Sequence, residues 1–254
     1  MGKELAREFA RRGARIALVD IDDIELERIY TELRAYGADA MSLECDVTSA
    51  EACGGAVDEI LAEWGRLDVL VNNAGMSHRS FFEDTDDDVL QKVMDVNFWG
   101  SVRMTRAALD ALLASDGHIA VMSSVAGFAP LTGRTAYAAS KHALHGFFES
   151  LRTEIADRNV DVTMICPSFV DNELSAVAAD GADVDTARAD VGAAIEAEDL
   201  ARRAVDAIID RRPRLVPTSV AKVAWWLSRV APSLYEKLMR RSQTSEFPHR
   251  DESS

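Results

Sequence analysis

The chain of 254 residues is poor in cysteine, which argues against folds that depend on disulfides or on a zinc site. Its three cysteines, Cys45, Cys53 and Cys166, are too few and too scattered for a disulfide framework or a zinc site. Because each lies in or beside an apolar stretch, we expect buried thiols in a reducing compartment. The sequence predicts no metal site.

Long apolar runs and a net positive charge are also absent. No uncharged stretch reaches the roughly 18 residues of a membrane span, and the N-terminus does not resemble a signal peptide. A cytoplasmic protein is therefore expected. The net charge of −15 would repel phosphate backbones, so we expect no nucleic-acid partner.

What is present is an alternation of short apolar strands with helices as far as about residue 172. Strands are predicted over 15–19, 40–45, 67–71, 119–122 and 160–165. Long helices are predicted over 86–114 and 135–157, and Thr48 with Glu51 forms a capping box that starts a helix ending at Trp64. The fold class is therefore α/β, a doubly wound parallel sheet of the Rossmann-like type.

Polar, small or turn-forming residues end the predicted strands. In a parallel sheet these ends share one edge, where ligands bind. We therefore expect one cleft, formed by Asp20, Asp46, Asn72 to Gly75, Ser123 with Ser124, and Cys166 to Ser168.

Tyr137 and Lys141 are separated by one helical turn, so they share a helix face. A neighbouring ammonium lowers a phenol's pKa, which makes the pair a candidate acid-base system. The alternative for this pair alone is a solvated helix face. Ser124 ends a strand and suits a hydrogen bond to a substrate oxygen. A serine hydrolase is disfavoured because Ser124 lacks the G-x-S-x-G turn.

Taken together, these motifs resemble the short-chain dehydrogenase/reductase family over about residues 2–172. The resemblance rests on Asn72-Asn73-Ala74-Gly75, Asn97, Ser124 and Tyr137-x-x-x-Lys141, in the family's order and spacing. It implies that Tyr137 exchanges the proton, Lys141 binds the nicotinamide ribose and Ser124 orients the reacting oxygen. Asn97 would hold a water molecule through its backbone.

The resemblance also implies a nicotinamide cofactor. NAD is favoured over NADP because the Asp20 carboxylate can bind two ribose hydroxyls and would repel a 2′-phosphate; Asp20 could instead simply cap a helix. Pro167-Ser168 stands where the family usually has Pro-Gly, and Asn172 where it usually has Thr. The implied cofactor-binding residues, besides Tyr137 and Lys141, are Gly2, Asp20, Asp46, Val47, Asn73, Ala74, Gly75, Pro167, Ser168 and Val170.

The start of the chain departs from the family. The family opens with a strand and a T-G-x-x-x-G-x-G turn, whereas Met1-Gly2 matches only the end of that turn. The fold is therefore expected to lack its first strand, which would leave neighbouring strands without partners. We expect about 10–20 further residues in frame upstream of Met1, enough for a strand and the phosphate-binding turn.

The sequence divides into a domain over 1–217, a segment over 218–241 and a polar tail over 242–254. Residues 173–198 match the family's substrate lid, with a plain surface loop as the alternative. Residues 211–241 hold eight Lys and Arg against the single acid Glu236. We expect an amphipathic helical segment over 219–241, broken near Pro232 and exposing Trp225 or Trp226. It would contact a membrane surface, an apolar substrate or another subunit.

The function that the resemblance implies is hydride transfer between NAD(P) and a secondary alcohol or ketone, with Tyr137 as general acid and base. The substrate would be a small, apolar molecule, or a carrier-bound or lipid ketone. A homodimer or homotetramer is implied, paired through the helices at 86–114 and 135–157. The alternative is a non-catalytic homologue with a structural or binding role.

Overall fold

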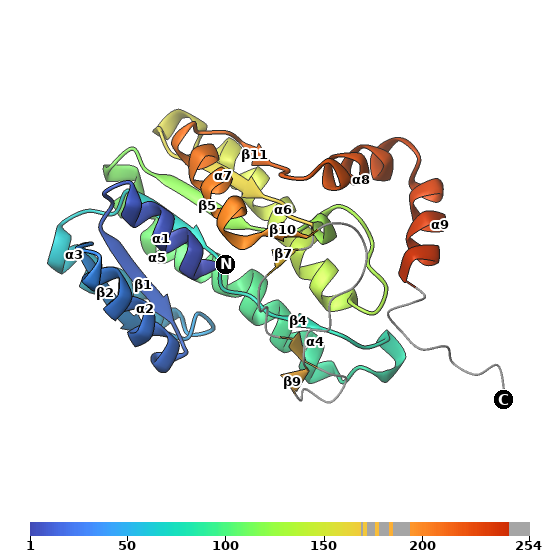
Figure 1. Ribbon diagram of the computed structural model, residues 1–254, viewed down its shortest axis with the longest axis horizontal. Coiled ribbons are helices and arrows are strands. Elements are labelled where there is room, and N and C mark those ends of the chain that lie inside the picture. Colours follow the sequence, from blue (N-terminus) through green and yellow to red (C-terminus); the bar gives the residue numbers. More distant parts are fainter. Residues whose placement is uncertain (169, 172–175, 178–182, 185–193, 244–254) are drawn as a thin grey trace.

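A computed structural model describes residues 1–168, 170–171, 176–177, 183–184 and 194–243, without the side chains of 171, 176–177, 183–184 and 239–243. Helices cover both faces of a parallel sheet, and two further helices project from one end of this body (Figure 1). The α/β fold class predicted from the sequence is confirmed. The polar tail and most of the predicted lid lie outside the described residues.

The main sheet has four parallel strands in the order β11-β6-β5-β3. They are β3 (Val69–Asn72), β5 (His118–Met122), β6 (Asp161–Ile165) and β11 (Arg214–Leu215). A second parallel pair consists of β1 (Ile16–Asp20) and β2 (Ala40–Glu44). Every residue of β5 is buried, which explains the unbroken apolar run of this central strand.

Apolar helix faces pack on the two sides of the strands. One side carries α1 (Gly2–Arg11), α2 (Asp23–Ala35) and α7 (Ala197–Ile209). The other carries α3 (Ala50–Trp64), α5 (Gly100–Ala114) and α6 (Thr135–Glu154). Leu112, Leu144 and Phe148 are among the fully buried side chains of this second layer.

The sheet is interrupted between β1 and β3, where the sequence predicted a missing strand. No pairing joins these two strands within the described part of the chain. A groove of about 610 Å³ separates them and is lined by residues along both strands. Leu5 and Phe9 of α1 line it from one layer, and Ile60 of α3 and Met104 of α5 from the other. The groove therefore has strand edges as its walls and apolar side chains from both helical layers.

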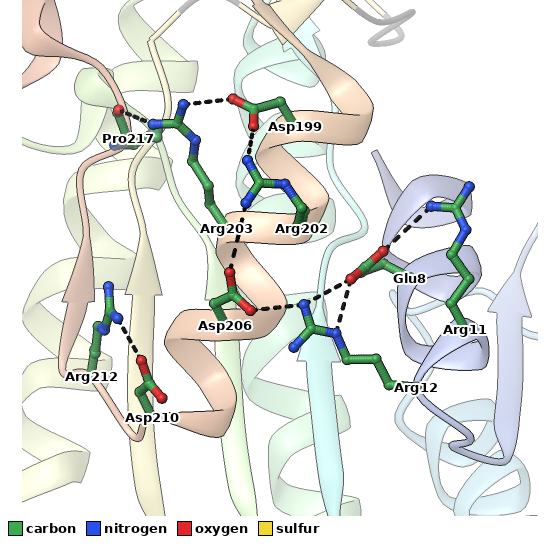
Figure 2. A network of polar contacts seen from close by, with 10 residues as sticks. All are labelled: Glu8, Arg11, Arg12, Asp199, Arg202, Arg203, Asp206, Asp210, Arg212 and Pro217. Carbon is green, nitrogen blue, oxygen red and sulfur yellow. Dashed lines mark hydrogen bonds and ion pairs between the residues drawn. The ribbon is translucent and has the colours of Figure 1, made fainter.

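Ion pairs join the C-terminal end of α1 to α7 (Figure 2). Arg12 lies 2.8 Å from Glu8 on its own helix and 2.7 Å from Asp206 on α7. Asp199 of α7 contacts both Arg202 and Arg203. These charges are largely exposed, so the network fixes how the helices meet more than it stabilises the fold.

Local boundaries correct some predictions. Ser49, not Thr48, caps α3: its hydroxyl accepts a hydrogen bond from the Ala52 N–H at 3.1 Å. The Thr48 hydroxyl is instead held by the Asp46 carboxylate at 2.8 Å. The last strand of the main sheet is Arg214–Leu215.

The helix predicted over 86–114 is continuous but has one wider turn. It consists of α4 (Asp87–Met94), the π-helical turn η2 (Asp95–Trp99) and α5. The predicted segment over 219–241 forms α8 (Ser219–Val230) and α9 (Pro232–Gln243), broken at Ala231 next to Pro232. Trp226 is the exposed tryptophan of the adjacent pair, as that prediction allowed.

Candidate functional site

The predicted site residues gather at the carboxyl edge of the strands. Ser124 lies two residues beyond β5 and caps the short 3-10 turn η3 (Val125–Gly127), because its hydroxyl accepts the Ala126 N–H at 3.1 Å. Tyr137 and Lys141 occupy the first two turns of α6. Helix geometry thus aims both side chains at the strand ends.

Tyr137 contacts two of the other predicted side chains, Ser124 and Lys141. The Tyr137 hydroxyl forms a hydrogen bond with Ser124. The Lys141 Nζ lies 5.5 Å from the centre of the Tyr137 ring and donates to the Met122 carbonyl at 2.8 Å. Lys141 is therefore fixed by the end of β5, with its ammonium over the phenol ring.

Burial dominates the ionisation of this cluster. It raises the pKa of Tyr137, and this outweighs the lowering by the Ser124 hydrogen bond and the Arg134 charge. It also lowers the pKa of Lys141 to about 8. The net direction for Tyr137 is thus the opposite of the one predicted from Lys141, and the phenol stays protonated at neutral pH.

Asn97 is fully buried in the π-helical turn, and its side chain connects the segment after β3 to α6 through hydrogen bonds. Its Oδ1 accepts the Met76 N–H at 2.8 Å, and its Nδ2 donates to the Met76 carbonyl and to the Ser140 hydroxyl, each at 2.9 Å. Ser140 in turn donates to the Tyr137 carbonyl at 2.8 Å. Turns of this kind are often found at functional sites. Asn97 therefore positions the loop after β3 against α6.

Ser140 was missed by the sequence reasoning. It is fully buried between Asn97 and the backbone of Tyr137. The available signal was its position one residue before Lys141, on the helix turn between Tyr137 and Lys141.

The residues predicted for the cofactor line the carboxyl end of the groove. Gly2, Asp20, Val47, Asn73 and Ala74 all border it. The Asp20 Oδ1 accepts the backbone N–H groups of Ile21 and Asp22 at 2.8 and 3.2 Å, and neither bond uses Oδ2. Asp20 therefore keeps one carboxylate oxygen for a ligand.

Two glycines let the backbone approach this space closely. A Cβ on Gly2 would lie 2.9 Å from the Asn73 Nδ2, and one on Gly75 would lie 3.1 Å from the Asn97 Oδ1. The same Gly75 position is 3.6 Å from the Lys141 Nζ. The donor set and the close backbone thus fit the ribose and nicotinamide end of a dinucleotide.

The remaining predicted cofactor residues lie around this centre. The Asp46 Oδ1 accepts hydrogen bonds from the Thr48 N–H and hydroxyl, each at 2.8 Å. Asp46 does not border the groove, while its neighbour Val47 does. The Pro167 carbonyl accepts the Val125 N–H at 2.9 Å next to Ser124. Ser168 is bonded to Thr218 at 3.0 Å, and Val170 begins β7 (Val170–Asp171), which pairs with β10 (Ile195–Glu196).

Described parts of the predicted lid lie beside the site. Strand β8 (Ala176–Val177) pairs with β4 (Ser77–His78), which directly follows Met76, and with β9 (Asp183–Val184). The segment predicted as a lid therefore runs along the loop that Asn97 fixes.

A second chain of reactive groups lies behind Lys141. The Cys166 Sγ is 3.7 Å from the His145 Nε2, and the His145 Nδ1 is 3.1 Å from Glu149. Cys166 is fully buried, and burial raises its pKa to about 12, so the group remains a thiol. All three cysteines are buried and free, as predicted. In the part of the chain that the structure describes, no three His, Cys, Asp or Glu side chains group to hold a metal.

Comparison with known proteins places this site in a family. The profile of the short chain dehydrogenase family matches residues 1–207. The chain belongs to the short-chain dehydrogenase/reductase family. It is 34% identical over 249 residues to the dehydrogenase/reductase SDR family protein 7-like of Drosophila melanogaster, covering 95% of this chain and 76% of that protein.

Other relatives agree with this assignment. The 11-beta-hydroxysteroid dehydrogenase 1A of Arabidopsis thaliana is 41% identical over 69% of this chain and 50% of its own length. An alcohol dehydrogenase from the archaeon Thermococcus sibiricus, solved with 5-hydroxy-NADP, shares the fold with a TM-score of 0.75. It is 24% identical and covers 86% of this chain and 92% of its own. Family membership makes the chain an oxidoreductase by type.

Proposed function

We propose that this short-chain dehydrogenase/reductase interconverts a secondary alcohol and a ketone with NAD as hydride carrier. The observation that carries the proposal is the contact set of Tyr137, Ser124 and Lys141, beside a groove bordered by Asp20 and Asn73. The nicotinamide supplies hydride chemistry when bound. Everything else in the reaction is assigned to side chains of this chain.

In the direction of reduction, the Tyr137 hydroxyl donates a proton to the carbonyl oxygen as the carbonyl carbon gains the hydride. The raised pKa of Tyr137 keeps that proton in place at neutral pH. Ser124, hydrogen-bonded to the same hydroxyl, orients the carbonyl oxygen. In the direction of oxidation, the phenolate takes the proton back from the alcohol.

Lys141 and Asn97 have positioning roles in this proposal. Lys141 is held between the Met122 carbonyl and the Tyr137 ring, so its ammonium can bind ribose hydroxyls and stabilise the phenolate. The Asn97 side chain is bonded to Met76 and Ser140, and its backbone carbonyl accepts the Ser101 hydroxyl at 2.9 Å, so the proposed water would share that carbonyl with Ser101. A small, apolar alcohol or ketone is the proposed substrate class.

Replacing Tyr137 by phenylalanine tests the chemistry. Tyr137→Phe removes only the hydroxyl, so we expect turnover to fall at least about a thousandfold while the cofactor still binds. Tyr36→Phe, on an exposed tyrosine, is the matched control and should keep full turnover. Equal turnover of the two variants would contradict the proposal and favour a non-catalytic binding role.

The preference for NAD is tested at Asp20. In Asp20→Asn the 2′-phosphate no longer meets a carboxylate, so the ratio of kcat/KM for NAD to that for NADP should fall at least about tenfold. Asp23→Asn makes the same charge change three residues away, on the first turn of α2, and should leave the ratio unchanged. An equal change of this ratio in both variants would show that Asp20 only supports the turn before α2 and does not select the cofactor.

Cytoplasmic localisation and a homodimer or homotetramer remain predictions. Trp99, 44% exposed on the continuous α4–α5 helix with the Arg103 guanidinium 6.0 Å from its ring centre, supports a contact there.

A further inference from the structure

The two C-terminal helices present apolar side chains to solvent. Helices α8 and α9 project from the end of the α/β body (Figure 1). They attach to it through a small cluster that contains Ala129, Ala224 and Tyr235. Outside this cluster, six apolar residues of the two helices are exposed by about half or more: Val220 57%, Val223 63%, Trp226 62%, Val230 61%, Leu234 50% and Leu238 48%.

Helical spacing gathers the α8 members of this set into one stripe. Val220, Val223, Trp226 and Val230 follow at intervals of three and four residues, so they share one face of α8. Ala221 and Ala224 are buried on the other side. A surface helix normally turns polar residues outward, so this outer apolar stripe needs a partner.

Cationic side chains flank the stripe. Lys222 and Arg229 are exposed on α8, and Lys237 is exposed on α9. The Arg229 guanidinium lies 4.4 Å from the centre of the Trp225 ring and 5.7 Å from that of Phe128. Its charge is therefore held where α8 meets the body, at one border of the stripe. Across residues 211–241 the sequence has eight Lys and Arg and one acid, in a chain of net charge −15.

We propose that the α8–α9 face docks on the surface of an anionic phospholipid membrane. Trp226 and the neighbouring valines would enter the headgroup boundary, while Lys222, Arg229 and Lys237 meet lipid phosphates. The helices lie on the bilayer and do not cross it: within the described residues, no helix has the length and hydropathy of a membrane span. The strongly acidic remainder of the chain is repelled, so only this end can approach.

Charge argues against a second copy as the occupant. A two-fold contact through this face would set the cations of one α8–α9 unit against those of the other. An anionic bilayer instead supplies both apolar material and the opposite charge. The start of α8 lies next to a proposed cofactor residue, since Thr218, which caps α8, bonds Ser168 at 3.0 Å.

Vesicle flotation of the full chain tests the proposal. We expect it to float with phosphatidylcholine vesicles that contain phosphatidylserine, and to float poorly with phosphatidylcholine alone. The double variant Val223→Ser, Trp226→Ser should reduce flotation about tenfold. Ile21→Ser with Ile24→Ser removes two exposed apolar side chains far along the sequence and should leave flotation unchanged.

Circular dichroism and light scattering complete the test. All four substituted side chains are exposed, so both variants should keep the parent's spectrum and melting temperature. Failure of the folded parent to float would overturn the proposal, as would equal flotation of the two double variants. A lower oligomer mass for the Val223, Trp226 variant, without flotation of the parent, would assign the face to a subunit contact instead. Flotation does not depend on turnover, so this result stands apart from the catalytic proposal.

Discussion

At the scale of single residues, Lys141 shows how a functional group can oppose stability. It is almost fully buried, and its pKa falls from the model-peptide value of 10.5 to about 8. Its ammonium donates a hydrogen bond to the Met122 carbonyl. Keeping the ammonium charged inside the protein at neutral pH therefore lowers the stability of the fold. The proposed role of Lys141 in binding and catalysis accounts for a residue that is unfavourable for stability.

We expect Lys141→Met to be more stable than the parent at pH 7. The pKa difference corresponds to about 3 kcal/mol, from which loss of the hydrogen bond subtracts about 1 kcal/mol. Folding lowers the pKa of the Lys141 amine from 10.5 to about 8, so below pH 8 burial of the charged amine lowers the free energy of unfolding. This cost disappears as the pH rises towards 10.5, because the amine then loses its charge. Urea unfolding at pH 7 and pH 10 measures this. A variant less stable than the parent at pH 7 would show that the amine contributes more than burial costs.

At the scale of elements, helix α1 covers the groove with both charged and apolar contacts. Arg12 joins Glu8 and Asp206 at the surface, while Leu5 lies 3% exposed in the core shared with α7. Burying the leucine removes apolar surface from water, whereas pairing the charges gives up their favourable hydration. The leucine should therefore dominate the attachment.

Two alanine substitutions separate these contributions. Leu5→Ala should lower the free energy of unfolding by about 3 kcal/mol, and Arg12→Ala by a small part of that. Raising the salt concentration should remove the Arg12 effect and leave the Leu5 effect intact. Chemical unfolding at low and high salt checks both. A larger loss for Arg12→Ala would mean that the network in Figure 2 holds α1 in place.

At the scale of the whole molecule, the groove between β1 and β3 divides the sheet. Unpaired strand edges and apolar side chains from both helical layers line it, which is the environment of a central parallel strand. The Met1 amine, at the start of α1, is partly buried, and burial lowers its pKa. An apolar strand in the groove would end at the carboxyl edge, near Gly2 and Asn73.

A chain extended before Met1 tests this groove. Adding an apolar five-residue strand and a T-G-x-x-x-G turn should stabilise the protein by at least about 3 kcal/mol. It should also tighten NAD binding at least about tenfold, because the turn places backbone N–H groups for the pyrophosphate. An extension of equal length built from Gly and Ser is the control. Equal unfolding midpoints for the two extended proteins would show that the groove does not accept a strand.

The sequence by itself determined the alternation of strands and helices and the residues at the strand ends. These depend on local periodicity and on motif spacing, so Ser124, Tyr137 and Lys141 could be named and placed at one edge. The interrupted sheet also followed from the order of motifs, and the structure shows it between β1 and β3.

Only the tertiary structure decided what each group touches. Contacts between segments far apart in sequence set three outcomes. These are the direction of the Tyr137 pKa shift, the bonds from Asn97 to Met76 and Ser140, and the buried Cys166–His145 contact. The same holds for α8: its periodicity allowed either Trp225 or Trp226 to be exposed, and packing on Ala129 and Phe128 turned Trp226 outward. Burial and long-range contacts set these outcomes, and neither is encoded in a local pattern.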